Sequence, residues 1–375
     1  MFRKFPITIN PLFWLFAAFI GWTFTENLTG TIVCMIVVVI SLIVHEAGHA
    51  LTAKAFGQDV RIHISFFGGV TLREGPKLSL WKEFLIVLAG PAAGFALWGF
   101  TIFLGKNLPQ ISPIVYTALV FSYFINLYWT LLNLIPVGPL DGGRLLSIVL
   151  ESIFGVRGVK AALYIGVGVG IATAIFAAYM NQIYVAILFV LITFETAKSI
   201  KDAKLMTAQD RDFRLQELFD SAQKAYQNNQ VDESLKLFDQ VRRKSTSGIL
   251  HYSATEAMAQ ILKNQGRDDE AYNYLKDIKE SLSTSSMPLY HELAAKFGDY
   301  PEVVRWGHQV YQIVPTAQTA YFNALAHAAL AETQAAIGWL ECAMQEGMDV
   351  TKHLDAEPFD RIRSTPEFQK FVQRN

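Results

Sequence analysis

Two histidines and a glutamate have the types and spacing of a metal-dependent catalytic site: His45, Glu46 and His49, in the pentapeptide HEAGH. On a helix, positions i and i+4 lie on one face, so both imidazoles can reach one Zn²⁺. Glu46 would then lie beside a water molecule on that metal, where a carboxylate can act as a general base. The alternative is a pair of histidines packed in a helix bundle, with Glu46 paired to a lysine such as Lys54. A catalytic zinc site usually needs a third protein ligand, which the rest of the chain must supply.

The element that must hold these residues is an apolar helix. Residues 31–44 read TIVCMIVVVISLIV, with no charge, and the pattern continues through HEAGH to Gly57 without a break. Such a run is typical of a membrane span or a deeply buried helix, and ionisable residues within a membrane helix mark function by default. Residues 1–200 contain nearly all the long apolar runs, and we predict six spans there, at about 11–25, 31–56, 82–105, 111–135, 159–179 and 182–199.

Lysine and arginine residues, from Arg3 and Lys4 onward, gather on one side of these predicted spans, and only Lys106 lies on the other side. The positive-inside rule therefore predicts that both termini are cytoplasmic, and an even number of spans agrees. The N-terminal segment resembles a signal peptide but lacks a clear small-residue cleavage site. Trp14 and Trp22 suit an interfacial anchor, so we expect it to be retained.

Composition excludes several other classes. The chain has 375 residues, of which 52% are hydrophobic and 17% charged, and its net charge of -1 gives no reason to expect nucleic acid as a partner. Its two cysteines, Cys34 and Cys342, argue against a disulfide framework and exclude a cysteine-based metal site.

A short hairpin is predicted between the second and third spans. Val60, Ile62 and Ile64 alternate with polar residues, Gly68 and Gly69 suggest a turn, and residues 70–72 suggest a second strand. Its edge could bind an extended peptide by strand addition, or it could be a plain connection, and the sequence favours neither. His63 falls on the polar face and is expected to be a surface residue. The segment AGPAAG at 89–94, within the third span, indicates close helix packing.

The third zinc ligand is sought in the irregular segment that follows the fourth span. Residues 133–144 read NLIPVGPLDGGR, in which two prolines break the helix and glycines allow a tight backbone. Broken backbone at membrane depth is tolerated mainly where it lines a cavity, so the Asp141 carboxylate is the natural candidate. The alternative is that Asp141 caps a helix that begins at Gly142.

HEAGH in an apolar helix, followed by NLIPVGPLDGG, resembles the site-2 protease family of intramembrane zinc metalloproteases, whose second signature has the form N-x-x-P-x-x-P-x-D-G. The resemblance covers residues 1–200. It implies that His45, His49 and Asp141 bind zinc, that Glu46 is the catalytic acid and base, and that Asn133 lies close to the site and orients the substrate or the broken helix. The FFGG segment that ends in Gly68 and Gly69 and the GPAAG segment also resemble family features.

Two departures from the family pattern are visible. Family members often have an asparagine where this chain has Gly94, so any role of that side chain is absent. No segment resembles the PDZ domain of many members or the paired nucleotide-binding modules of others.

The second half of the chain, after a charged linker at 201–212, is polar, helical and repetitive. Four similar segments carry a small or β-branched residue at matching positions, 37, 32 and 33 residues apart: Ser234, Ala271, Val303 and Ala336. A period near ~34 is tetratricopeptide-like. We therefore expect residues 213–375 to form a soluble α-solenoid of four repeats with a C-terminal capping helix, whose concave face binds protein segments. Its histidines show no metal spacing and are expected to be surface or packing residues: His251, His291, His308, His327 and His353.

The fold class expected is therefore an all-α polytopic membrane protein with a small membrane-associated β-hairpin, followed by an α-solenoid. The function expected is a zinc endopeptidase that cleaves a transmembrane segment of another protein, with the repeats recruiting the substrate, an adaptor or an inhibitor. Membrane lipid would surround the spans, and a bacterial inner (plasma) membrane is the expected location because no transit peptide is evident. One alternative is a catalytically silent membrane scaffold that binds partners through the repeats. A metal transporter is a weaker alternative, because we find one histidine cluster and no path of ligands.

Overall fold

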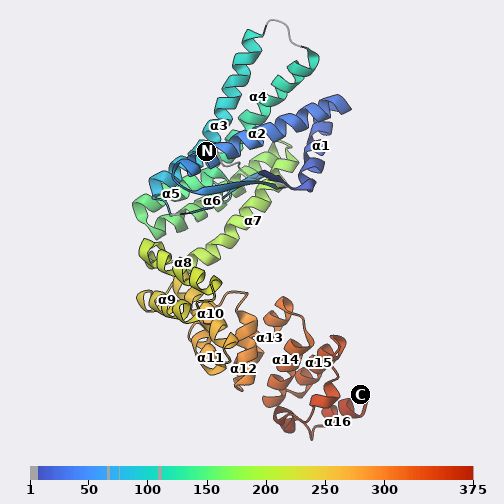
Figure 1. Cartoon of the computed structure of the whole chain (residues 1–375). Coiled ribbons are helices and arrows are strands. Elements are labelled where there is room, and N and C mark those ends of the chain that lie inside the picture. The colour runs from blue at the N-terminus through green and yellow to red at the C-terminus, as the bar shows by residue number, and fades with distance from the viewer. Residues whose placement is uncertain (1–6, 66–67, 76, 109–111, 375) are drawn as a thin grey trace. The chain divides into compact units, whose positions relative to one another are not determined.

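The computed structural model describes residues 7–65, 68–75, 77–108 and 112–374 (Figure 1). The chain divides into two compact units, Met1–Lys204 and Leu205–Asn375. Arg3 and Lys4, which contribute to the predicted orientation, and Phe66 and Phe67 of the FFGG segment lie outside the described residues. We describe each unit separately.

Within the described part of the first unit, five helices are long and apolar enough to cross a membrane: α2 (Leu28–Ala55), α3 (Leu80–Asn107), α4 (Pro113–Asn133), α6 (Val156–Tyr179) and α7 (Ile183–Leu205). The protein is therefore an integral membrane protein. Helix α1 (Pro11–Thr25), the first predicted span, has only 15 residues. At 1.5 Å per residue it extends about 22 Å, which is short of a hydrocarbon core of about 30 Å. By this measure the structure supports five of the six predicted spans, and α1 would cross the hydrocarbon core only together with the residues that flank it.

A three-stranded sheet packs against the first two helices. It contains β1 (Ile7–Ile9), β2 (Asp59–Ser65) and β3 (Gly68–Glu74), in that order, so that β3 is an edge strand. Strand β1 is parallel to β2, and β3 is antiparallel to it. The predicted hairpin is confirmed, but Gly68 and Gly69 belong to its second strand and not to a turn; residues 66–67, which join the two strands, lie outside the described residues.

The alternation in β2 explains where the sheet lies. Val60, Ile62 and Ile64 are buried in a core that includes Phe13 of α1 and Leu42 of α2. Because successive strand residues point to opposite faces, this apolar face fixes which side of the hairpin meets α2.

Helix α2 has a defined start and end. The Asn27 side chain accepts a hydrogen bond from the Gly30 amide at the N-terminus. At the C-terminus Gly57 has φ +87°, and the Gln58 amide donates to the Ala53 carbonyl, as in a Schellman cap. No proline lies between these caps, so HEAGH occupies an unbroken part of the helix.

Helix α3 packs closely along α2, as the AGPAAG segment predicts. A Cβ added to Gly48 would lie 2.3 Å from the Ala89 carbonyl oxygen, and one added to Gly94 would lie 2.3 Å from the Thr130 Oγ1 of α4. The small residues therefore serve helix packing. The space at Gly94 is filled by Thr130.

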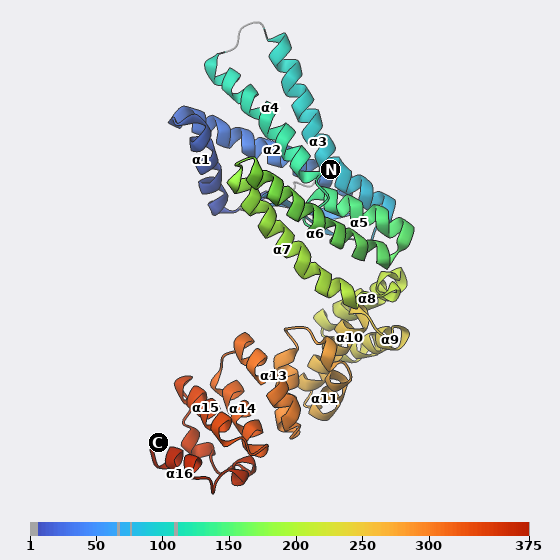
Figure 2. The ribbon, with the colours of Figure 1, turned by 180° about the vertical axis from the view of Figure 1, so that it is seen from behind.

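The predicted break after α4 is present. Helix α4 ends at Asn133, an irregular segment covers residues 134–140, and α5 (Asp141–Phe154) begins immediately afterwards. The two prolines in the segment, Pro136 and Pro139, have no amide hydrogen to continue the helix. Seen from behind in Figure 2, α5 is followed by α6, which packs beside it.

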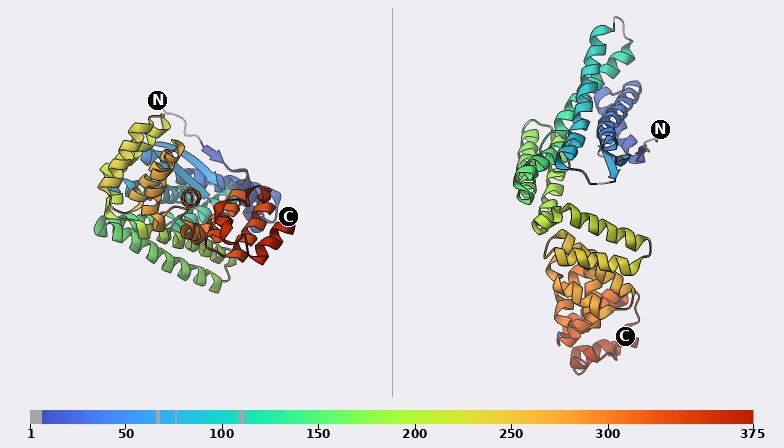
Figure 3. Two further views of the ribbon diagram at one scale, coloured as in Figure 1. Left: turned by 90° about the horizontal axis from the view of Figure 1, so that it is seen from below. Right: turned by 60° about the vertical axis from the view of Figure 1, so that its left-hand side comes forward.

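The second unit consists of paired antiparallel helices, followed by α16 (Pro366–Arg374). The pairs are α8 (Phe213–Gln227) with α9 (Val231–Lys244), α10 (Ile249–Asn264) with α11 (Asp268–Asp277), α12 (Met287–Lys296) with α13 (Tyr300–Ile313), and α14 (Ala317–Ala329) with α15 (Thr333–Gln345). Short 3-10 helices lie at Ala208–Arg211, Lys279–Ser281, Val350–His353 and Glu357–Arg361. The right-hand view of Figure 3 shows the yellow-green pair α8 and α9 lying side by side.

The four pairs share one turn geometry. A residue of positive φ lies two positions after the end of each first helix, and the residue after it donates its amide to a carbonyl five positions earlier, as in a Schellman cap. The positive-φ residues are Asn229, Gly266, Gly298 and Ala331. The residues predicted at the helix crossings from the repeat spacing all have 0% exposed surface: Ser234, Ala271, Val303 and Ala336. Each is the fourth residue of its helix, which explains why they share one position in the packing.

Candidate metal centre

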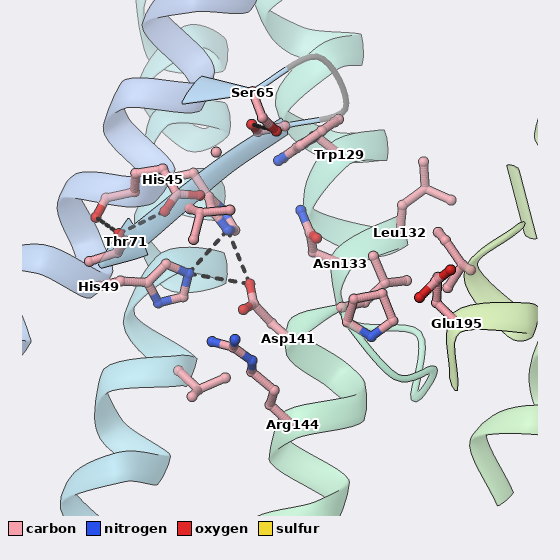
Figure 4. Close-up of a pocket in the computed structure, with 18 of the residues that line it drawn as sticks. His45, His49, Ser65, Thr71, Trp129, Leu132, Asn133, Asp141, Arg144 and Glu195 are labelled. Atoms are coloured by element: carbon pink, nitrogen blue, oxygen red, sulfur yellow. Dashed lines mark hydrogen bonds and ion pairs between the residues drawn. The ribbon is translucent and has the colours of Figure 1, made fainter. Parts of the chain in front are cut away.

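His45, His49 and Asp141 converge at one buried point of the first unit (Figure 4). The two histidines come from one face of α2, and the aspartate is the first residue of α5. Their exposed fractions are 3%, 8% and 9%. The structure thus brings together residues from two sequence motifs that are far apart in the chain.

The three atoms that face one another are the Nε2 atoms of both histidines and Oδ2 of Asp141. The His45 nitrogen lies 3.0 Å from the carboxylate oxygen, the His49 nitrogen lies 3.4 Å from it, and the two nitrogens are 3.3 Å apart. Ligand atoms about 2.0 to 2.1 Å from a tetrahedral Zn²⁺ are ~3.3 Å from one another. The triangle therefore fits one face of a zinc coordination sphere, and the fourth position remains for a non-protein ligand.

The His49 ring is oriented by α3. Its Nδ1 donates a hydrogen bond to the Ile86 carbonyl oxygen at 2.7 Å, which leaves the lone pair of Nε2 directed toward His45 and Asp141. The ring also needs space, because a Cβ added to Gly90 would lie 2.1 Å from Nε2. One helix thus supplies both the acceptor that orients His49 and the gap that accommodates it.

The position of Asp141 distinguishes between its two sequence-based interpretations. Helix α5 begins at Asp141 itself, Leu140 occupies the N-cap position, and no side chain makes a capping hydrogen bond. The carboxylate is directed to the histidines instead. The interpretation of Asp141 as the cap of a helix that begins at Gly142 is therefore wrong.

Glu46 lies beside the triangle and is 5% exposed. Its Oε2 accepts a hydrogen bond from Oγ1 of Thr71 at 2.7 Å. A Cβ added to Gly69 would lie 2.4 Å from the Cγ of Glu46. Strand β3 therefore lies against one side of this carboxylate. The partner that the structure gives Glu46 is a threonine from the hairpin.

The three other predicted residues, Asn133, Gly68 and Gly69, line the same cavity, which has a volume of about 550 Å³. Figure 4 shows Asn133 between Trp129 and Asp141. His63, expected to be a surface residue, lies elsewhere and its Nδ1 is 2.8 Å from Oγ1 of Thr8 in β1.

Several cavity residues were not anticipated from the sequence. Helix α7 contributes one wall, which includes Phe189, Ile192 and Glu195. A glutamate within the predicted span 182–199, near its C-terminal end, is a signal that could have identified Glu195. Thr71 carries no such signal, because a threonine in a predicted strand is ordinary.

Comparisons with known proteins agree with this site. Residues 33–114 and 107–177 match the model of Peptidase family M50. A provisionally named zinc metalloprotease of Synechocystis sp. is 32% identical over 182 residues, which is 44% of this chain and 47% of that protein. A zinc metalloprotease of Methanocaldococcus jannaschii is 30% identical over 174 residues, 46% of this chain and 50% of that protein. The stage IV sporulation protein FB of Bacillus subtilis is 32% identical over 151 residues, 39% of this chain and 48% of that protein.

The chain thus spans about half the length of these curated relatives. Among solved structures, the site-2 protease from Methanocaldococcus jannaschii is similar, with 23% identity, a TM-score of 0.40 and coverage of 53% of this chain and 94% of that one. The family match and the relatives support the resemblance to site-2 proteases inferred from the two motifs, and the matched residues lie within the first unit. The buried triad fits Zn²⁺.

Proposed function

We propose that the first unit is an intramembrane zinc endopeptidase that cleaves transmembrane segments of other proteins. The single observation that carries this proposal is the triangle of His45, His49 and Asp141 at 3.0 to 3.4 Å, with Glu46 buried beside it, among helices that can span a membrane. Structural zinc sites are closed by four protein ligands, whereas three ligands and an open position suit catalysis.

The chemistry divides between the metal and this chain's residues. Zinc held by the triad would supply Lewis acidity, which lowers the pKa of water to about 7 and polarises a carbonyl. Glu46 would accept the proton of the attacking water on a carboxylate oxygen and deliver it to the leaving amine nitrogen. Because the triad and Glu46 are buried, bulk water has little access to the reacting atoms.

The substrate must be unwound, because the peptide bonds of a helix are shielded by its own turns. Strand β3 is the edge of the sheet, and residues from Gly68 to Thr71 line the cavity. An extended peptide could therefore pair with β3 by strand addition beside the triad. Asn133, at the end of α4, would orient the substrate or the broken helix.

The second unit would recruit the substrate, an adaptor or an inhibitor. Four helix pairs with one turn geometry support a tetratricopeptide-like solenoid, which typically binds protein segments. Removing residues 205–375 should weaken substrate selection and leave zinc content unchanged. Loss of zinc on truncation would contradict this division of roles.

The setting we propose is a bacterial inner membrane with both termini cytoplasmic. It is supported by basic residues at the expected cytoplasmic ends of the helices, such as Lys54 near the end of α2, Arg157 at the start of α6 and Lys198 in the last part of α7. Reporter fusions to each terminus would test it.

The activity is tested by two measurements, zinc content and proteolytic cleavage in detergent. The substrate is a model protein with one transmembrane span that contains a helix-breaking residue. We expect about one zinc per chain and cleavage for the wild type. Glu46→Gln should retain zinc and lose cleavage, whereas Asp141→Ala should lose both. Glu74→Gln changes an exposed glutamate of β3 and serves as the matched control.

A folded wild-type protein without zinc would contradict the site and favour the alternative of a silent membrane scaffold. Metal flux in vesicles with no cleavage would favour a transporter instead.

A further inference from the structure

Strand β3 contacts the proposed general base directly. Oγ1 of Thr71 lies 2.7 Å from Oε2 of Glu46 and 3.3 Å from the Glu46 carbonyl oxygen. A hydroxyl has one proton to donate, and the shorter, charge-assisted bond to the carboxylate is the stronger of the two. Because Glu46 is 5% exposed, this bond also compensates for part of its loss of water.

Gly69 leaves the space that Glu46 occupies. A Cβ at this position would lie 2.4 Å from Cγ, 2.6 Å from Cδ and 2.6 Å from Oε1 of Glu46. Gly69 and Thr71 are two residues apart in a strand, so they point to the same face. On this face of β3, the Thr71 hydroxyl donates to Oε2 of Glu46, and Gly69, which has no side chain, lies beside Oε1.

The strand that makes these contacts is held in place by its neighbour. Thr71 is paired with Ile62 and Gly69 with Ile64. Both isoleucines belong to β2 and are buried in the core against α2, with exposed fractions of 2% and 0%. The buried isoleucines fix β2, and a slip of β3 by one residue against β2 would turn the Thr71 hydroxyl to the opposite face of the sheet, away from Glu46.

We propose that Thr71 is a positioning residue for Glu46: its hydroxyl holds Oε2, so that Oε1 is the oxygen that accepts the proton of the attacking water and delivers it to the leaving amine. Gly69 keeps that oxygen uncovered. The inference rests on the proposed function of Glu46. It gives the hairpin a role in the proton transfer, separate from any pairing of its free edge with a substrate.

The alternative is that Thr71 only satisfies a buried polar group and contributes to folding. The two roles predict different kinetics. A positioning role changes the chemical step, so that kcat falls while KM is nearly unchanged. A purely structural role lowers stability or zinc content and leaves the kinetics of the folded fraction intact.

The experiment compares Thr71→Val with Thr71→Ser, using the full-length protein and the single-span model substrate. Valine has the shape of threonine without the hydroxyl, and we expect kcat to fall on the order of 10- to 100-fold with zinc retained. Serine keeps the hydroxyl and should restore kcat to within about threefold of wild type. Thr173→Val is the matched control, because it removes a threonine hydroxyl that donates to the Val169 carbonyl within its own helix, α6, at 2.9 Å.

A second variant, Gly69→Ala, tests the same geometry independently. The added Cβ should displace the Glu46 carboxylate and lower kcat with zinc retained, even if Thr71→Val fails to fold. An unchanged kcat in Gly69→Ala would overturn the proposal.

An infrared measurement provides a readout that does not depend on activity. The difference spectrum between the metal-free wild type and Glu46→Gln isolates the carboxylate bands of Glu46. These bands should shift in Thr71→Val and not in Thr71→Ser, because hydrogen bonding alters carboxylate stretching. If Thr71→Val and Thr71→Ser have the same carboxylate bands, or lose kcat to the same extent, Thr71 does not position Glu46. That outcome would leave the proposed role of Glu46 as general base unaffected. A wild type that does not cleave would instead overturn the proposed function.

Discussion

The two units use polar side chains in contrasting ways. In the described part of the first unit, the buried charged groups gather at one point, where His45, His49, Asp141 and Glu46 meet. In the second unit, four ion pairs lie side by side between the second and third helix pairs, at N–O distances of 2.6 to 2.8 Å: Lys296 with Asp268, Lys276 with Asp299, Lys279 with Glu302 and Arg305 with Glu280.

The contrast follows from the surroundings. A charge within an apolar bundle is costly, so such groups persist where they bind a metal or perform chemistry. Partly exposed ion pairs contribute little individually, and the second unit gains its stability from apolar contacts repeated at each helix pair. One substitution should therefore abolish the function of the first unit, whereas the second unit should lose stability in graded steps.

The largest expected effect is on zinc binding in Gly90→Ala. The added methyl group would lie 2.1 Å from Nε2 of His49 and displace the ligand atom. We expect zinc affinity to fall by about 10- to 100-fold, as for other changes that disturb ligand orientation. Competition with a chromogenic chelator measures it.

Gly99→Ala in the same helix is the matched control, because a Cβ there meets no atom within 4 Å. It should bind zinc like the wild type. Equal zinc affinity for Gly90→Ala and the wild type would show that the first unit tolerates displacement of His49. It would contradict the expectation that a single substitution abolishes the function of this unit.

A smaller effect, on stability alone, is expected for Leu340→Ala in α15. Leu340 is fully buried in an apolar core with Phe359 and Phe368. The cavity should lower the free energy of unfolding by about 2 to 5 kcal/mol. Chemical denaturation measures this change, and zinc content should not change.

Leu330→Ala is the control, because Leu330 is 38% exposed and its truncation should cost little. Loss of zinc in Leu340→Ala would mean that the two units are coupled, which would contradict the separation of roles.

The smallest effect is a pH dependence of the second unit that arises from His291. Burial lowers the pKa of this histidine, and the hydrogen bond between its Nε2 and Oδ1 of Asn323, at 2.8 Å, only partly opposes that shift. The unfolded chain therefore binds a proton more readily than the folded chain, so stability falls as the pH drops below about 6.5. The unfolding midpoint should be lower at about pH 5.5 than at about pH 7.5.

His291→Gln should reduce this difference between the two midpoints. His308→Gln is the control, because His308 is an exposed histidine of the neighbouring helix α13. If the unfolding midpoints of both variants change equally with pH, His291 is not the source of the pH dependence.

Much of the fold follows from local patterns in the sequence. The apolar run before HEAGH predicts α2, the alternation at residues 60–64 predicts β2, and the repeat spacing matches the helix crossings of the second unit. The errors lie where local signals compete. Helix α1 is apolar but shorter than a usual span, and the two glycines predicted to form a turn belong to a strand.

By itself, the sequence determined the chemistry available to this protein: two imidazoles on one helical face, a neighbouring carboxylate, and a second motif with an aspartate. Helical periodicity is enough to align His45 and His49, because it depends only on their spacing. The tertiary structure decided the position of Asp141 beside the two histidines, the hydrogen bond that Glu46 accepts from Thr71, and the wall that α7 adds to the cavity. These features depend on contacts between residues far apart in the chain, and packing of the sheet and helices, not local propensity, selects them.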